Sequence, residues 1–287
     1  MQVQAAAKLN LMLDAVGTLP DGYHSLFMIM QSVTLYDTVS VTETDGGIAV
    51  ACADARVPTD ERNIVHKAAR LFFEATGKPA GVRIAIDKRI PMAAGLAGGS
   101  ADAAGTLYCL RAMFAPTLSD RALCEIGERT GADVPFALTG GTALCMERGG
   151  VIAPLRDLDP CWFVLCKPDM DVSTKAAYQK LDETPRLRHL DKNAMLYAVH
   201  KGDMALLCEK AGNVFEQVVE VPLRPYIKGV MRECGASLAL MSGSGPTVYG
   251  LFFRKADAER CAERLQKKFR EVYVCERAVR GIEETGA

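Results

Sequence analysis

A run of small residues between positions 91 and 104 restricts the fold of this chain more than any other feature. It reads Pro-Met-Ala-Ala-Gly-Leu-Ala-Gly-Gly-Ser-Ala-Asp-Ala-Ala, between a predicted strand and a predicted helix. Free backbone N–H groups and the helix dipole favour an anion at such a helix start, and small side chains let a phosphate approach. The run predicts a phosphate-binding loop. The alternative is a tight turn that only permits close helix packing.

Two familiar nucleotide-binding patterns are absent. The chain contains neither Gly-x-x-x-x-Gly-Lys-Ser/Thr nor Gly-x-Gly-x-x-Gly after a strand. A second small-residue turn, 241–247, lies between two predicted strands. It is either a second group of backbone donors or an ordinary hairpin loop.

The charge and composition exclude several functional classes. The net charge is −1 and basic residues are spread along the 287 residues, so we expect no nucleic-acid partner. The N-terminal residues do not form a signal peptide, and no apolar run is long enough to span a membrane. We therefore expect a cytoplasmic protein with no membrane partner.

The cysteines predict buried thiols rather than a metal centre. The chain has ten cysteines but no Cys-x-x-Cys pair, and its four histidines are widely separated. Several cysteines occupy apolar positions, where cysteine packs as a small hydrophobe. These are Cys109, Cys145, Cys166 and Cys275. No structural metal is expected.

Hydrophobic periodicity predicts an α+β fold with helices on one face of a mainly antiparallel sheet. Strands are predicted at 3–13, 31–44, 82–86, 142–147, 162–167, 237–241, 247–253 and 271–275. Helices are predicted at 63–76, from the glycine run to 114, at 119–130 and at 256–269. Asn63 and Ser119 are the expected N-caps, and Gly77 is an expected helix end.

Prolines 154 and 160 flank the preferred domain boundary. We expect an N-terminal domain at 1–155, which contains the predicted phosphate-binding loop, and a C-terminal α+β domain at 156–287.

The two small-residue loops, together with Lys8-Leu9-Asn10-Leu11, resemble the three motifs of the GHMP small-molecule kinase superfamily in order and spacing. Two further segments are more specific than a glycine loop: Pro-Asp-Gly-Tyr-His at 20–24 and Gly-Ala-Asp-Val-Pro-Phe at 131–136. With segments 31–37 and 87–91, they resemble the 4-diphosphocytidyl-2-C-methyl-D-erythritol kinases of that superfamily. The resemblance covers nearly the whole chain.

The resemblance implies a two-domain GHMP kinase fold with the active site in the interdomain cleft. It implies an ATP-dependent kinase, with Mg²⁺ accompanying ATP, that phosphorylates the 2-hydroxyl of 4-diphosphocytidyl-2-C-methyl-D-erythritol in non-mevalonate isoprenoid synthesis. Two alternatives stay open: another GHMP kinase, of the homoserine or mevalonate type, and a non-catalytic nucleotide sensor. The sequence predicts no oligomeric state.

The same resemblance makes Lys8 and Asp133 the catalytic residues. Phosphoryl transfer requires alignment, charge neutralisation and a group that accepts the proton of the attacking alcohol. Asp133 would accept the proton, and Lys8 would keep it ionised. The alternatives are an Asp133 that only caps the helix beginning at Val134-Pro135, and a Lys8 that lies in water at a strand end.

The remaining site residues follow from the resemblance as well. Substrate would be bound by Asn10, Tyr23, His24 and Tyr178, with Tyr23 stacked on cytosine and His24 hydrogen-bonded to it. For Tyr178, packing in a helix core is the alternative. ATP would be bound by Asn63, Lys88, Pro91, Met92, Ala93, Ala94, Gly95, Leu96, Ala97, Gly98, Gly99, Ser100 and Ala101.

Three loop residues depart from the superfamily pattern. Ala97 and Ala101 replace a frequent Gly and Ser, and Asp102 replaces a frequent Asn. The backbone N–H donors of the loop are the same with any of these three residues. The carboxylate of Asp102 must point away from phosphate or toward a magnesium ion.

Overall fold

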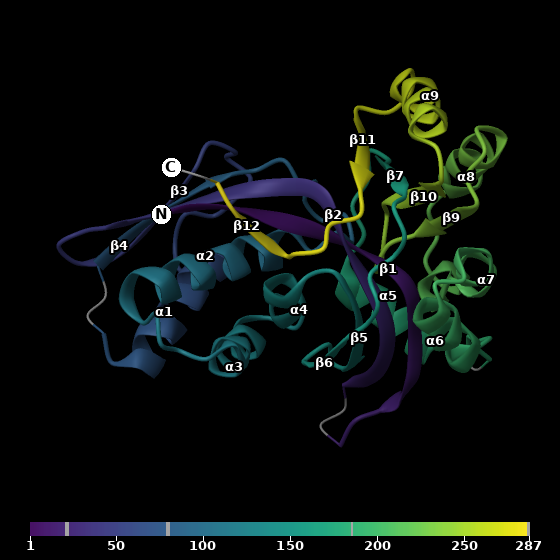
Figure 1. Ribbon diagram of the computed structural model, residues 1–287. Helices are drawn as coiled ribbons and strands as arrows, with labels where there is room; N and C mark the ends of the chain where they lie inside the picture. The colour runs from purple at the N-terminus through teal and green to yellow at the C-terminus, as the bar shows by residue number, and fades with distance from the viewer. Residues whose placement is uncertain (21–22, 79–80, 185, 286–287) are drawn as a thin grey trace.

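The computed structural model describes residues 1–20, 23–78, 81–184 and 186–285. A long hairpin, β1 (Gln2–Thr18) and β2 (His24–Glu43), forms the centre of the larger of two sheets (Figure 1). The strand order of this sheet is β12-β1-β2-β4-β3. In addition, β5 pairs with β2, β6 pairs with β5, and β8 pairs with β1. The other members are β3 (Gly47–Cys52), β4 (Gly81–Asp87), β5 (Thr142–Glu147), β6 (Val151–Pro154), β8 (Gly212–Asn213) and β12 (Ile282–Glu284).

Helices lie on one face of the larger sheet, as Figure 1 shows, and the third of them packs against the other helices rather than on the strands. They are α1 (Ile64–Thr76), α2 (Gly98–Phe114), α3 (Asp120–Thr130) and α4 (Val134–Thr139). Apolar side chains such as Val39, Phe72 and Leu107 form the core between these layers. The predicted caps are confirmed: Asn63 accepts a hydrogen bond from the Val65 amide, and Ser119 caps α3 in the same way.

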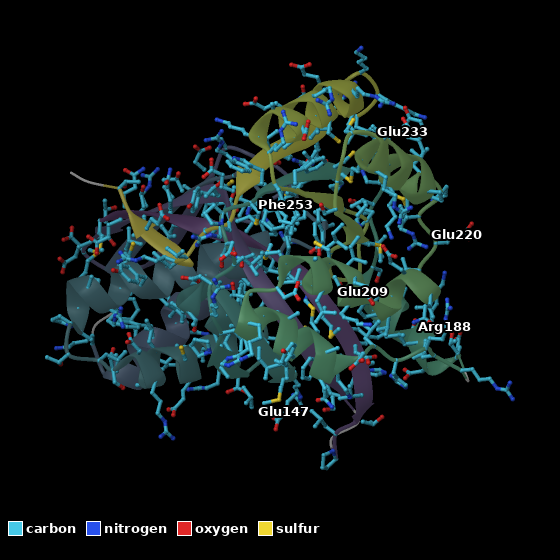
Figure 2. All side chains as sticks on the ribbon, turned by 45° about the vertical axis from the view of Figure 1, so that its right-hand side comes forward. Glu147, Arg188, Glu209, Glu220, Glu233 and Phe253 are labelled. Atoms are coloured by element: carbon cyan, nitrogen blue, oxygen red, sulfur yellow. The ribbon has the colours of Figure 1, made fainter. Side chains whose placement is uncertain are left out.

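The smaller sheet has the order β11-β7-β10-β9. Its strands are β7 (Trp162–Lys167), β9 (Leu238–Met241), β10 (Val248–Phe252) and β11 (Glu271–Glu276), and α8 (Arg224–Glu233) and α9 (Lys255–Gln266) pack on it. The remaining helices are α5 (Thr174–Asp182), α6 (Lys192–Lys201), α7 (Met204–Lys210) and the 3₁₀ turn η1 (Val214–Gln217). Side chains fill the space between these layers, and labelled charged residues such as Glu220 lie at the surface (Figure 2).

The α+β architecture is confirmed, but several strand bounds differ from the prediction. β1 continues to Thr18 rather than ending at Leu13, and β2 begins at His24 rather than Gln31. β1 pairs with residues 24–40 of β2 across three register shifts, and these irregularities interrupt the alternation of side chains. The sequence did not predict β3, because this edge strand is only half-buried and its pattern is weak.

Two strands from the C-terminal part of the chain join the larger sheet. β8 pairs in parallel with β1, and β12 pairs antiparallel with the beginning of β1, beside the N-terminus in Figure 1. The predicted boundary between residues 155 and 156 stays a prediction. None of the described helices is both long and apolar enough to cross a membrane.

Candidate active site

A cavity of about 1150 Å³ lies where the glycine loop, the centre of the hairpin and helix α5 meet. Residues predicted for the site from distant parts of the sequence line it together. They are Lys8, Asn10, Tyr23, His24, Asn63, Lys88, Asp133, Tyr178 and the loop residues 91–95 and 97–100. Two predicted loop residues, Leu96 and Ala101, are buried in the hydrophobic core and do not line the cavity.

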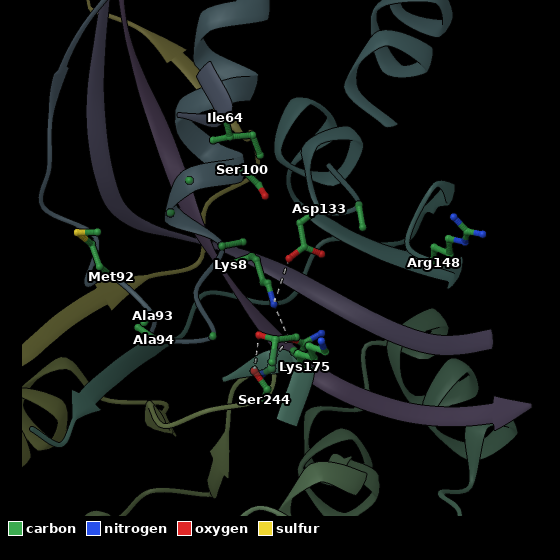
Figure 3. A pocket seen from close by; sticks show the side chains of 18 of the residues that line it. Lys8, Ile64, Met92, Ala93, Ala94, Ser100, Asp133, Arg148, Lys175 and Ser244 are labelled. Carbon is green, nitrogen blue, oxygen red and sulfur yellow. Dashed lines mark hydrogen bonds and ion pairs between the residues drawn. The ribbon is translucent and has the colours of Figure 1, made fainter. Parts of the chain in front are cut away.

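Lys8 and Asp133 point toward each other in this cavity, as Figure 3 shows. The Nζ of Lys8 lies 3.8 Å from Asp133 Oδ2. Asp133 stands at the N-cap position of α4, yet its carboxylate makes no capping hydrogen bond. The capping alternative is therefore wrong for this side chain. Lys8 is only 8% exposed, so the strand-end alternative in water is also wrong.

Asn10 connects the hairpin to the second small-residue loop. Its Oδ1 accepts from Lys8 Nζ at 2.7 Å and from the Gly243 amide at 3.1 Å. Its backbone carbonyl accepts from the Tyr249 hydroxyl at 2.9 Å. Its buried Nδ2 has no hydrogen-bond partner among the described residues, so a donor remains available at the cavity wall. A bound hydroxyl or phosphate oxygen would satisfy this donor.

The two small-residue loops contact each other. Ser242 Oγ donates to the Gly95 carbonyl at 3.0 Å, and the Lys8 amide donates to the Leu96 carbonyl at 3.1 Å. A Cβ at Gly95, where φ is +75°, would lie 2.2 Å from the Ser242 carbonyl oxygen. Loop 241–247 is thus more than a hairpin turn, because it packs against the glycine loop and closes the cavity.

The opposite end of the cavity is aromatic. His24 shares a hydrogen bond of 2.8 Å with Asp182, the last residue of α5, and its ring centroid lies 4.8 Å from that of Tyr178. The Arg148 guanidinium carbon lies 3.9 Å from the centroid of the Tyr23 ring. Three aromatic side chains predicted for the substrate therefore gather at one end, with a cation against one of them.

Lys88 is held by two carboxylates below the glycine loop. Its Nζ donates to Asp37 and, at 2.7 Å, to Asp102 Oδ2. A Cβ at Gly98, the first residue of α2, would lie 3.2 Å from this Nζ. Asp102 thus points to Lys88 and also lines the cavity, and its predicted orientation relative to phosphate stays a prediction. The predicted contact of Lys88 with the nucleotide stays a prediction.

Sequence reasoning missed several residues that line the cavity. They include Arg148, Lys175, Asp182 and Ser244. Lys175 lies in the first turn of α5, one turn before Tyr178, and Figure 3 shows it beside Ser244. The neighbouring Thr174 hydroxyl lies 3.1 Å from Ser244 Oγ and connects α5 to the second loop. The one sequence signal near Lys175 is the predicted substrate residue Tyr178, three positions further along the chain.

The thiol prediction is confirmed, since all ten cysteines are free and Cys109, Cys145, Cys166 and Cys275 are buried. Among the residues that the structure describes, no group of three or more His, Cys, Asp or Glu side chains could hold a metal ion.

Comparison with known proteins decides the family. The model for the GHMP kinases N terminal domain matches residues 63–141, and the model for the GHMP kinases C terminal matches 195–271. A 4-diphosphocytidyl-2-C-methyl-D-erythritol kinase of Clostridium tetani is 40% identical over 96% of this chain and 99% of its own length. One from Exiguobacterium sibiricum is 45% identical over 95% of this chain and 96% of its own. The chain belongs to the GHMP kinase family.

Solved structures agree with this assignment. A crystal structure of a 4-(cytidine 5'-diphospho)-2C-methyl-D-erythritol kinase covers 97% of this GHMP kinase and 99% of its own chain, with a TM-score of 0.81 and 32% identity. A homoserine kinase from Cytophaga hutchinsonii has a TM-score of 0.80 at 19% identity, covering 99% of this chain and 96% of its own. The second likeness shows the fold alone. The predicted GHMP fold and resemblance are confirmed.

Proposed function

We propose that this GHMP kinase transfers the γ-phosphate of ATP to the 2-hydroxyl of 4-diphosphocytidyl-2-C-methyl-D-erythritol, giving ADP and the 2-phosphate. The reaction belongs to non-mevalonate isoprenoid precursor synthesis, and the proposed location of the enzyme is the cytoplasm. Relatives that bear this name, 40–45% identical over nearly the full chain, carry the proposal. The site supports it with an acid–base pair, an amide-rich loop and an aromatic end in one cavity.

Asp133 is the proposed acceptor of the proton of the attacking hydroxyl. Its carboxylate is 30% exposed, faces the cavity and is free of the helix cap. The Lys8 ammonium lies 3.8 Å from this carboxylate and would stabilise negative charge on the acceptor oxygen. Asn10 holds Lys8 in place and has a donor left for the substrate.

The ATP phosphates would bind the glycine loop at the N-terminus of α2. Residues 98–100 form the first turn of α2 at the cavity wall, so their amides are free of helix partners. Asn63, which caps α1, would lie near adenine or ribose. Mg²⁺ would accompany ATP, held mainly by phosphate oxygens as this ion prefers, and would neutralise charge on the phosphates.

The cytosine would lie at the aromatic end. Tyr23 and Tyr178 offer ring faces, and His24, oriented by Asp182, offers a ring nitrogen for a hydrogen bond. A diphosphate that links cytidine to the acceptor sugar would pass Lys175 on its way to Lys8. This two-ended cavity fits a long, charged substrate better than it fits a small amino alcohol.

Homoserine and mevalonate kinases are the competing assignment. Their structures share the fold at 19% and 16% identity, which carries no substrate argument. The deciding experiment couples ADP release to a panel of the cytidylyl substrate, homoserine and mevalonate, with ³¹P NMR of the product. We expect turnover of the cytidylyl substrate alone. Phosphorylation of homoserine or mevalonate in its place would refute the proposal, and nucleotide binding without any ADP release would favour the sensor.

A further inference from the structure

Three charged side chains form a buried cluster directly beneath the glycine loop. Asp37 lies on β2, Lys88 follows β4, and Asp102 lies in the second turn of α2. The Lys88 ammonium donates to both carboxylates, and each of the three side chains is 7% exposed or less. Charges are rarely buried this deeply unless each one is paired.

The two carboxylates have unequal surroundings. Asp37 accepts from the Lys88 ammonium and from two backbone amides, those of Arg89 at 2.6 Å and Ile90 at 2.8 Å. Within the described part of the chain, Lys88 is the one hydrogen-bond donor to the Asp102 side chain, through Oδ2. Its Oδ1 is buried without a partner among the described residues. A negative charge is therefore much better satisfied on Asp37 than on Asp102.

The cluster also supports the loop that would hold the triphosphate. Asp37 fixes the backbone at residues 89 and 90, immediately before the loop begins at Pro91. Lys88 Nζ lies below Gly98, where the loop enters α2, and Asp102 fixes the turn that follows. Both ends of the loop thus rest on the same three side chains.

We propose that Asp102 is a protonated, neutral acid, that Lys88 and Asp37 form the ion pair, and that this neutral cluster positions the glycine loop for ATP. Lys88 is a positioning residue in this account, because it acts through the loop. A second ionised carboxylate would give the cluster a net negative charge beneath the bound phosphates and would repel them. The inference rests on the proposed function only in taking ATP as the ligand of this loop.

The surroundings of Asp102 agree with a neutral acid. Burial raises its pKa well above the usual range, the Lys88 charge opposes this, and the Asp37 charge adds to it. Apolar side chains also meet this part of α2, among them Val3, Val39 and Ile64.

Infrared spectroscopy tests the protonation state directly and does not depend on the substrate. In protein labelled with ¹³C at aspartate carboxyls, we expect a protonated carboxyl band at neutral pH. The band should be lost in Asp102→Asn and kept in Asp133→Asn. Absence of the band at neutral pH, or its survival in Asp102→Asn, would overturn the assignment.

Calorimetry tests the positioning role with ADP and cytidine diphosphate as probes. In Lys88→Met we expect the Kd for ADP to rise about tenfold or more, a loss of roughly 1.4 kcal/mol, with the Kd for cytidine diphosphate changed less than about threefold. Lys67→Met is the matched control, because that ammonium binds the Thr130 carbonyl outside the cavity. An equal rise in the Kd for both ligands, or an unchanged Kd for ADP, would refute the proposal that Lys88 positions the loop.

Two double variants show which carboxylate carries the charge. Lys88→Met/Asp37→Asn removes both members of the proposed ion pair and leaves a neutral Asp102. Lys88→Met/Asp102→Asn leaves Asp37 ionised without its cation. We expect the first to recover more thermal stability and ADP affinity, relative to Lys88→Met, than the second does. The reverse order would place the charge on Asp102 and overturn the proposal.

Discussion

Asp133 holds its carboxylate 3.8 Å from the Lys8 ammonium instead of using it to cap helix α4. An aspartate at an N-cap position usually bonds to the amides of the first helical turn. Here Pro135 removes one of those amides, and the carboxylate faces the cavity. This geometry connects the fold to the proposed chemistry.

Replacing Lys8 with methionine should slow turnover strongly while the protein stays folded. Met has a similar shape but removes the charge next to Asp133, so we expect kcat to fall about 10²–10³-fold, as for loss of one charge-stabilising donor. Steady-state kinetics and the melting temperature measure this. Lys180→Met, on α5 but outside the cavity, is the control. A kcat within threefold of the parent would remove Lys8 from the mechanism.

Adding a methyl group at Gly95 and removing one at Ala97 should have very different effects on the glycine loop. Gly95→Ala places a Cβ 2.2 Å from the Ser242 carbonyl oxygen at a φ of +75°, so the two loops must separate. We expect the KM for ATP to rise about tenfold or more. Ala97→Gly removes a side chain from a φ of +58°, and we expect stability to change by less than about 1 kcal/mol. A Gly95→Ala protein that binds ATP like the parent would contradict the contact between the loops.

Removing the Asp182 side chain should weaken binding of the cytidylyl substrate and leave binding of ATP unchanged. Asp182→Ala leaves His24 without its partner at 2.8 Å, and because Asp182 is exposed the expected rise in substrate KM is modest, about 2- to 10-fold. The KM for ATP should not change. Glu183→Ala, the next residue and outside the cavity, serves as the control. An increase in the KM for ATP of the same size would show that His24 does not act at the substrate end.

Cys145 should resist alkylation in the folded protein. Burial and the Asp133 charge raise the pKa of its thiol to about 12. At pH 8, four units lower, only about 10⁻⁴ of the thiol is the reactive thiolate, and this fraction rises tenfold per pH unit below the pKa. Mass spectrometry after iodoacetamide treatment should find the partly exposed Cys52 modified first. Modification of Cys145 at the same rate would contradict its burial.

The sequence predicted what is decided locally. The caps at Asn63 and Ser119 involve residues two or three positions apart, and both are found in the structure. The full length of β1 and β2 could not be predicted, because bulges break their alternation and pairing across the hairpin sustains them.

Contacts between distant segments explain the other differences. Lys88 pairs with Asp37, which is 51 positions away in the sequence, and no local pattern predicts that pair. The same holds for His24 and Asp182, which are 158 positions apart. The family resemblance predicted that Lys8 and Asp133 share one site. It did not predict that Arg148 and Lys175 line the same cavity.

The most direct test of the account is turnover by Asp133→Asn, measured as ADP release with the cytidylyl substrate, alongside calorimetry with ADP. The account predicts a kcat about 10²–10⁴-fold below the parent, since a proton acceptor is lost, with ADP affinity unchanged. Asp169→Asn, an exposed aspartate outside the cavity, should behave like the parent. A folded Asp133→Asn protein that turns over at nearly the parental rate would contradict the central claim.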